Sequence, residues 1–484
     1  MKYTPAVSLL RSVAVLASGT AAGQAILVVA SPLLTRLYSP SQFGLLAAYM
    51  AAVAILGSVA TLRYELALAL PKRHDIALNV LALTLLCVAA TALISGLAIS
   101  VAGDQLAQLM GRSDMHAIAW LVPFGVLSIG TYTAVSQWSV RHRSFKTVAK
   151  TKVVQAVGQT ILQIGAAFTP LATFGLLLGN LLGQSAGITS LSREIVRRDR
   201  GAMRGVKLSR IWLVARHYWE FPAFSLAASV AFTAGQQLPS LIMFSMFGAG
   251  PAGFLLLAQR ISMMPASVLG SAVSQSLYRD VAEARRSAKM VGNVVLKPTR
   301  VLTNLVIGPA VLAALVAPWG TAVLFGHNWG EAGEYLRWLA PWVATTLTFA
   351  AMTPVVSVMG FQRLGLAFQV GSLAISTAAM VLVGQRYGAV AAIAAFSLSK
   401  TITVIVYRLH MFHMLKISPV PLLSSYLLQT AGFIAAFGGA LAVANWGSDA
   451  PWKWGAAAAL AVAGFASYGA LNFVTLREWR KSAG

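Results

Sequence analysis

The chain has 484 residues, of which 57% are hydrophobic and only 10% are charged. Soluble domains carry about 25% charged residues, so this chain could not cover its surface with polar groups in water. Its net charge of +24, from 37 Lys and Arg against 13 Asp and Glu, would suit a nucleic-acid-binding protein, but the basic residues fall on alternate loops between apolar runs. Composition therefore indicates a membrane protein and excludes a nucleic-acid partner.

Many apolar runs reach the ~20 residues that cross a hydrocarbon core of ~30 Å. The first run, from Ser12 to about Pro32, follows Lys2 and Arg11. It is longer than the 7–15-residue core of a signal peptide, so we expect a retained first helix. The sequence predicts an all-α polytopic protein of about fourteen transmembrane helices. The expected spans are 12–32, 44–70, 77–101, 117–138, 147–170, 172–192, 222–246, 252–277, 301–325, 335–358, 364–385, 388–409, 424–445 and 454–475.

The basic residues are distributed unequally between the two faces. About 29 of the 37 Lys and Arg lie with the termini and the loops on the same side, whereas the opposite side carries five, together with several acids. The positive-inside rule then places both termini in the cytoplasm. The five basic residues of the opposite side are Arg36, Arg112, Arg337, Arg386 and Lys453. The longest loop on that side is 102–116, which leaves no extracytoplasmic domain for chemistry.

The chain divides at a basic segment, 193–221, after the sixth span. We expect an N-terminal six-helix lobe over 1–192, a basic cytoplasmic linker over 193–221, a C-terminal six-helix lobe over 222–410, and two additional helices with a tail over 411–484. A repeat at an offset of about 210 residues supports two related lobes, since parallel repeats are common in transporters. SPLLTRLYSPSQFGLLAAY and LPSLIMFSMFGAGPAGFLLLAQ both place a Pro near a helix end, then a tight turn and a Phe with two Leu.

Motifs of soluble enzymes are absent from the sequence. It has no phosphate-binding loop, no H-E-x-x-H and no G-x-S-x-G pattern, so we expect no catalytic residues and no cofactor. Cys87 is the single cysteine, and the seven His are scattered. His410 and His413 are three residues apart at a helix end, where interfacial packing explains them at least as well as metal binding. We expect no metal site.

The sixth span carries glycines at strict four-residue spacing, which places them on one helix face and allows close backbone approach. Static helix packing and a sliding seam for conformational change both fit this pattern, and packing is the simpler explanation. The glycines are Gly175, Gly179, Gly183 and Gly187.

Ionisable residues inside the spans each cost about 2.5–3.5 kcal/mol or more at the bilayer centre, which makes them candidates for function. Lys400 lies near the middle of its span, and Arg260 lies too deep to reach the interface easily. Arg63 and Glu65 lie nearer the cytoplasmic end of the second span, where Glu65 or the interface could satisfy Arg63. Three buried cations against one anion predict a cavity for an anionic group such as a diphosphate.

Polar amides would add hydrogen bonds for a large hydroxylated cargo. Gln155, Gln159 and Gln163 recur every four residues and form one stripe, which more often lines a wet cavity than faces lipid. The further amides expected to line the cavity are Gln24, Gln236, Gln237 and Gln275.

Three stretches of this chain resemble the polysaccharide (Wzx-type) flippases of the multidrug/oligosaccharidyl-lipid/polysaccharide exporter superfamily. They are residues 33–71 (LLTRLYSPSQFGLLAAYMAAVAILGSVATLRYELALALP), residues 138–164 (WSVRHRSFKTVAKTKVVQAVGQTILQI), and residues 220–283, which begin EFPAFSLAASVAFTAGQQLPSLIMFSMFGAG. The later helices match in layout only.

The resemblance implies two MATE-like six-helix lobes around a central cavity that opens alternately to the two sides of the bacterial inner membrane. It implies a cargo of undecaprenyl-diphosphate-linked oligosaccharide, moved for O-antigen, capsule or exopolysaccharide synthesis, with polysaccharide polymerase and chain-length proteins as candidate partners besides membrane lipids. The two extra helices are similar to those of the lipid II flippase branch, which uses basic cavity residues on the helices that here carry Arg63 and Arg260. We expect Arg260 and Lys400 to bind the diphosphate and Arg63 to meet it near the cytoplasmic side.

Two other functions remain open at this stage. A multidrug or cation antiporter has the same architecture, but it would be expected to bury more acids. A membrane polymerase or ligase would need a larger extracytoplasmic loop. A proton gradient, a sodium gradient, the membrane potential or consumption of the product outside are all compatible driving forces.

Overall fold

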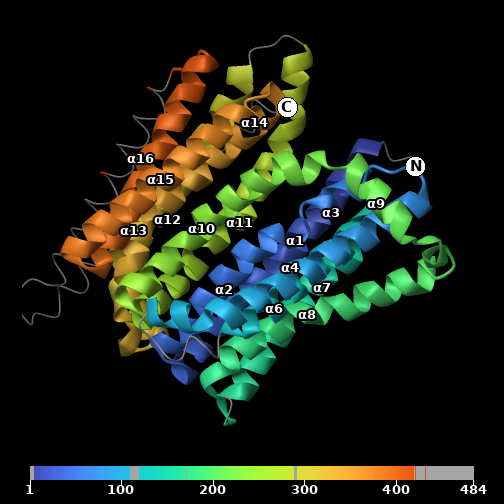
Figure 1. The fold of residues 1–484 in the computed structure, drawn as a ribbon. Helices are drawn as coiled ribbons and strands as arrows, with labels where there is room; N and C mark the ends of the chain where they lie inside the picture. Colours follow the sequence, from blue (N-terminus) through green and yellow to red (C-terminus); the bar gives the residue numbers. More distant parts are fainter. Residues whose placement is uncertain are drawn as a thin grey trace, which may run out of the picture. The chain divides into compact units, whose positions relative to one another are not determined.

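The computed structural model describes residues 5–109, 119–170, 172–287, 291–418, 420 and 431. All regular elements in these ranges are helical (Figure 1), which confirms the predicted fold class. Two compact units are present, Met1–Leu257 and Ala258–Gly484.

Unit 1 contains eleven complete helical elements in its described ranges and the beginning of a twelfth. They are α1 (Pro5–Leu37), α2 (Pro40–Ala60), α3 (Tyr64–Ala67), α4 (His74–Leu109), α6 (Leu121–Arg141), α7 (Phe145–Ala167), α8 (Ala172–Asp199), the 3₁₀ helix η1 (Ala202–Gly205), α9 (Leu208–His217), the π-helical turn η2 (Phe221–Ser225), α10 (Leu226–Phe247) and the first residues of α11 (Ala249–Arg286), where η1 and η2 are single short turns.

Unit 2 continues α11 and adds a second set of helices. They are α12 (Val291–Phe325), η3 (His327–Trp329), α13 (Gly330–Phe349), η4 (Ala350–Met352), α14 (Thr353–Met359), α15 (Gln362–Tyr387) and α16 (Ala389–Met414). Within this unit α12 packs on α13, α15 packs on α16, and α13 packs on α16.

Seven helical segments of the described chain are long and apolar enough to cross a membrane. They are Ala14–Leu37, Pro40–Ala60, His74–Val101, Val294–Phe325, His327–Met359, Gln362–Tyr387 and Ala389–Met414. The more polar helices α6, α7, α8, α10 and α11 have 21 to 38 residues and coincide with five further expected spans. The protein is therefore a multi-pass membrane protein. The expected spans 424–445 and 454–475 lie outside the described residues.

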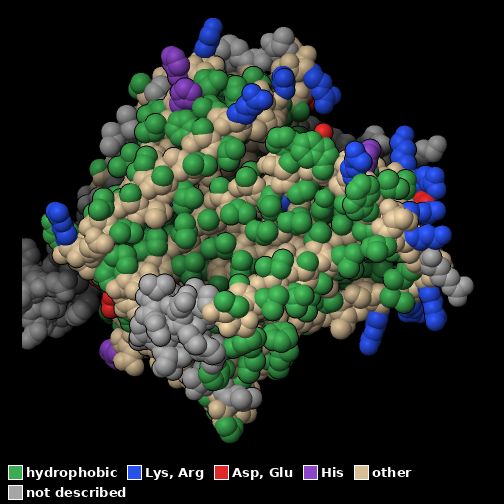
Figure 2. Space-filling model, viewed as in Figure 1, with side chains coloured by type: hydrophobic (Ala, Val, Ile, Leu, Met, Phe, Trp, Pro, Cys, Tyr) green, Lys and Arg blue, Asp and Glu red, His purple; other side chains and the backbone are tan. Residues whose placement is uncertain are grey.

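The side chains of α4 show the membrane setting in one helix. Val80, Thr84 and Val88 are fully buried against the protein, whereas Leu93 and Leu97 are 66% and 58% exposed. Water would penalise such an exposed apolar face, but lipid does not. Figure 2 shows hydrophobic side chains over the helices of unit 1, with Lys and Arg gathered at the end that carries α9.

The second expected span, 44–70, is wrong as a single helix. Helix α2 stops at Ala60, and Leu62 and Arg63 take left-handed φ values of 46° and 63° before α3 begins. Non-glycine residues adopt this conformation only where their surroundings impose it. Arg63 therefore lies in a break between two helices and not inside one. The span 335–358 is likewise divided, into α13, η4 and α14.

The expected linker, 193–221, is also structured. Its first part completes α8, and α9 packs on α4, with Ile211 and Val214 buried in a core shared with Leu191 and Ile195. Helix α10 packs on α2, so the described contacts group 222–257 with the first six spans and divide the chain inside α11. The lobe boundary at the linker stays a prediction.

The two repeat segments meet at their helix starts. A Cβ on Gly44 of α2 would fall 1.7 Å from the carbonyl oxygen of Ala249, the first residue of α11, and a Cβ on Gly253 would fall 1.9 Å from the carbonyl oxygen of Pro40, the first residue of α2. The same offset of 209 residues separates Gly44 from Gly253 and Pro40 from Ala249. Each glycine thus sits five residues into its helix and allows the other helix start to approach.

We predict that Gly44→Ala and Gly253→Ala each destabilise the protein by about 1–3 kcal/mol, since the added methyl group meets backbone that cannot rotate away. Thermal unfolding of the detergent-solubilised protein measures this. Gly371→Ala in α15 is the control, because nothing lies within 4 Å of its Cβ position and Ala favours a helix. Equal melting temperatures for all three variants and the unaltered protein would contradict the close packing.

Candidate functional site: buried cations within each unit

Arg63 is paired with an acid in the break after α2. Its Nη1 lies 3.1 Å from Oε1 of Glu65, and the Thr61 hydroxyl donates to Oε2 of the same carboxylate at 2.6 Å. Glu65 is 4% exposed and the Arg63 side chain 29%. Of the two ways of satisfying Arg63 that the sequence left open, the structure shows the pair with Glu65.

A cavity of about 750 Å³ opens beside this pair, where α3 and the end of α6 meet. Arg141 lines this cavity and donates hydrogen bonds to the carbonyl oxygens of Leu68 and Pro71, at 2.7 and 2.6 Å. Lys72 and Arg143 also line it, so the cavity carries a positive potential.

Lys152 on α7 is a half-buried cation that was not identified from the sequence. Its Nζ lies 4.3 Å from the centre of the Tyr132 ring, and the Tyr132 hydroxyl is 2.9 Å from that of Thr151. No ion pair of Lys152 is found among the described residues. Position alone could have identified it, because it lies two turns inside α7.

Lys400 in unit 2 is 6% exposed and lies near the middle of α16. Its Nζ is 5.8 Å from the centre of the Phe396 ring. The part of the chain that the structure describes gives Lys400 neither an ion pair nor a hydrogen bond. An ammonium group left in this state keeps its full attraction for an anion.

Arg408, nearly two helix turns from the end of α16, is also 6% exposed. Its Nη2 donates to the carbonyl oxygen of Thr345 at 2.8 Å and to the hydroxyl of Thr348 at 2.6 Å. From the sequence it belongs with the cytoplasmic basic residues, since nothing in the sequence shows that α13 covers it. Arg260 is half-buried within α11. Arg260 and Lys400 belong to unit 2 and Arg63 to unit 1.

The glutamine stripe of α7 lies in a helix interface and not on an open cavity, which corrects the expectation for Gln159 and Gln163. These two side chains are 6% and 0% exposed. Gln163 donates to the carbonyl oxygen of Leu176 at 2.9 Å, and Gln155 donates to that of Gln184 at 2.6 Å. The amide nitrogens of Gln155 and Gln163 are therefore bonded to α8 and not available to a cargo.

The four glycines of α8 make this interface possible. A Cβ on Gly179 would lie 2.4 Å from Cγ of Gln163, and one on Gly183 would lie 2.5 Å from Cβ of Gln159. A Cβ on Gly175 would likewise clash with the Tyr38 hydroxyl, and a Cβ on Gly187 would clash with Thr151. The glycine face of α8 thus receives the glutamine face of α7.

The remaining amides do not form one group. Gln24 and Gln236 are exposed and Gln237 is half-buried, while the side chain of Gln275 lies outside the described residues.

Charged residues buried in the described ranges comprise two acids and two cations, Glu65, Asp199, Lys400 and Arg408. Both acids have partners, Arg63 for Glu65 and His74 for Asp199 at 3.1 Å. The described helices therefore contain buried cations without acids but no buried acid without a partner, which favours an anionic ligand.

A family model described as polysaccharide biosynthesis protein matches residues 33–334, more than half of the chain. The chain belongs to this polysaccharide biosynthesis protein family. The resemblance found in the sequence is thereby confirmed.

One curated relative is the succinoglycan biosynthesis transport protein ExoT of Rhizobium meliloti (strain 1021), which is 25% identical over 324 residues. The match covers 64% of this chain and 61% of the relative, so the chain spans less than two thirds of that protein's length.

Solved structures share the fold at low sequence identity. The lipid II flippase MurJ in an inward closed conformation superposes with a TM-score of 0.75, at 10% identity, over 95% of this chain and 99% of that one. An inward-facing multidrug resistance MATE family transporter of the MOP superfamily gives a TM-score of 0.61, at 14% identity, over 83% and 94%. The family member therefore has the MATE-like transporter fold.

We predict that Lys400→Met raises the melting temperature by about 2 °C, because the substitution replaces a buried charge that no described acid compensates with an apolar chain of similar length. Lys297→Met is the matched control, since Lys297 is exposed on α12, and it should leave the melting temperature unchanged. If Lys400→Met melted below the control, the ammonium group would have a stabilising partner, and Lys400 would be structural.

Proposed function

We propose that this protein is a flippase that moves undecaprenyl-diphosphate-linked oligosaccharide from the cytoplasmic to the periplasmic leaflet of the bacterial inner membrane. The observation that carries the proposal is the buried Lys400, a cation without a described acid partner inside a transporter of a polysaccharide biosynthesis family. Surface polysaccharide synthesis, whether of O-antigen, capsule or exopolysaccharide, would use the product.

The chemical task explains why such cations are retained. A diphosphate leaves water only if fixed positive groups replace its hydration, and each buried cation costs several kcal/mol when no anion is present. Lys400 and Arg260 in unit 2 and Lys152 in unit 1 would share this role. Arg63 would take part only if its pair with Glu65 opened, so we assign it a secondary role near the cytoplasmic side.

Alternating access supplies the transport cycle. The cargo headgroup would bind in one state and be released in the other, and net movement requires different affinities in the two states. We propose cytoplasmic termini from the distribution of Lys and Arg. We further propose that transport is coupled to a proton or sodium gradient. We also propose that the protein associates with polymerase and chain-length proteins.

A multidrug or cation antiporter is the second candidate, because a MATE transporter shares the fold. Cationic cargo would be expected to use a buried carboxylate. In the described ranges Glu65 and Asp199 are the buried acids, and each already has a basic partner, so the charge balance favours the anionic cargo.

Deletion of the gene tests the proposed reaction. We expect lipid-linked oligosaccharide to accumulate in the cytoplasmic leaflet, which its inaccessibility to an added periplasmic glycosidase would reveal. Unchanged polysaccharide export together with new sensitivity to cationic compounds would instead establish the antiporter.

Charge-neutralising variants test the binding residues. We predict that Lys400→Gln and Arg260→Gln each lower polysaccharide export at least tenfold at unchanged protein level, since loss of a good charged contact costs more than about 1.4 kcal/mol. Lys297→Gln and Lys146→Gln, both at exposed positions, serve as controls. Unaltered export by both Lys400→Gln and Arg260→Gln would refute the assignment of these residues, and the deletion test would then decide the flippase reaction by itself.

A further inference from the structure

We propose that His74, His142 and Asp199 form a binding site for a divalent transition-metal ion of the zinc type. The three residues occupy helix ends in unit 1. His74 is the first residue of α4, His142 follows the last residue of α6, and Asp199 is the last residue of α8. The site is independent of the proposed cargo, because it rests on the geometry of this unit alone.

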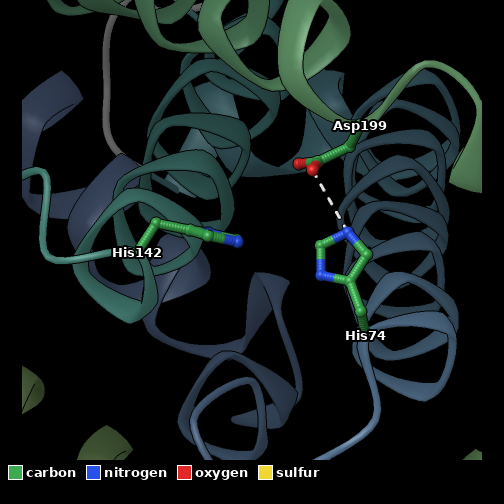
Figure 3. A group of neighbouring side chains, drawn as sticks. All are labelled: His74, His142 and Asp199. Carbon is green, nitrogen blue, oxygen red and sulfur yellow. Dashed lines mark ion pairs between the residues drawn. The ribbon is translucent and has the colours of Figure 1, made fainter.

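The ligand atoms already face one another. Nε2 of His74 lies 3.1 Å from Oδ1 of Asp199, and one ligand atom from each of the three residues falls within 4.8 Å of the other two. Figure 3 shows the His142 ring directed toward the space between the other two side chains. Zinc–nitrogen and zinc–oxygen bonds of about 2.0–2.2 Å place neighbouring tetrahedral ligands roughly 3.3 Å apart. Small side-chain rotations would bring the three to that distance.

Hydrogen bonds behind the ligands fix their orientation. Nδ1 of His142 lies 3.0 Å from the carbonyl oxygen of Trp138, so Nδ1 carries the hydrogen and Nε2 keeps a free lone pair. Nε1 of Trp138 donates to Oδ2 of Asp199 at 3.1 Å, which leaves Oδ1 for the ion. Metal-binding His and Asp are held by such outer hydrogen bonds in most zinc sites.

Trp138 links the two ligands rigidly. It is 1% exposed, and its ring packs against both imidazoles, with centroid distances of 5.5 Å to His74 and 4.9 Å to His142. A side chain held this firmly reduces the freedom that its neighbours lose on binding an ion.

The charge and the access of the group also suit a cation. Asp199 is 4% exposed, and a buried carboxylate needs a positive partner. His74 is 41% exposed at its side chain, and the cavity of about 750 Å³ is lined by both His74 and His142. Glu65 in the cavity wall offsets part of the positive charge of Lys72 and Arg143, so an ion can reach the two imidazoles from this cavity, and water can complete its coordination as a fourth ligand.

The competing state is a simple ion pair between protonated His74 and Asp199, with His142 as a packing residue. The two states differ in a measurable way, because only the metal site requires His142. The sequence analysis predicted no metal site, since these residues are separated by 68 and 57 positions and form no spacing motif.

Metal titration of the full-length protein tests the proposal. The detergent-solubilised chain, purified without a polyhistidine tag and stripped with a chelator, is titrated with Co²⁺ and then with Zn²⁺. We expect one equivalent of Co²⁺ to give the intense visible absorption of four- or five-coordinate cobalt, and Zn²⁺ to displace it and raise the melting temperature.

His142→Ala and Asp199→Asn are expected to weaken Co²⁺ affinity at least tenfold. His217→Ala on α9 is the control, because this exposed ring contacts Tyr218 and lies outside the proposed site. If a variant fails to fold, the Co²⁺ and Zn²⁺ titration of the unaltered protein still tests the site. Absence of the cobalt bands together with an unchanged melting temperature in zinc, or equal affinity in folded His142→Ala, would overturn the site.

Discussion

Hydrocarbon offers no hydrogen-bond partner, so every polar group that a membrane helix carries has to find one within the protein or bear the cost. The described helices meet this constraint locally where they can. The hydroxyl groups of Thr84 and Thr299 donate hydrogen bonds to the carbonyl oxygens of Val80 and Val295, one turn earlier in the same helix. The longer Gln163 side chain reaches across to a carbonyl oxygen of the next helix. Polar residues of this kind fix helix contacts and say little about cargo.

Buried charges are harder to satisfy than neutral polar groups. A buried charge with a partner is structural, and one without a described partner is a candidate for function. Glu65 and Asp199 are each matched by a basic neighbour and by a second hydrogen bond, from Thr61 and from Trp138. Lys400 has only an aromatic ring near its ammonium group in the described part of the chain. A group that reduces stability in this way persists where it is used, which is the reason for assigning it to the headgroup of the cargo.

The sequence predicted the helices better than their contacts. Hydropathy located the spans through 388–409, because length and apolar character are properties of one segment. The break at Leu62 and Arg63 was missed, since neither residue is a type that favours a left-handed backbone. Periodicity correctly placed the glutamines of α7 on one face, but it could not say what covers that face. The glycines of α8 have the same four-residue spacing, so the sequence could have indicated that they pack on these glutamines. Small residues on one helix leave room for long side chains of its neighbour.

The site residues divide in the same way. The depth of Lys400 is visible in the sequence, because helix length fixes it. Arg408 is bonded to Thr345 and Thr348, which lie 63 and 60 residues earlier in the chain, and no local pattern predicts such a contact. The grouping of two His with an Asp at three helix ends likewise exists only after folding.

The reciprocal packing of Gly44 and Gly253 also limits how the two helix starts can move. Each glycine lies against the first residue of the helix that carries the other, which is the pattern of an isologous contact in a two-fold symmetric dimer. Because the same contact is made twice, neither helix start can separate from the other without opening both contacts. The crossing of α2 and α11 thus acts as a single fixed point for the two helices.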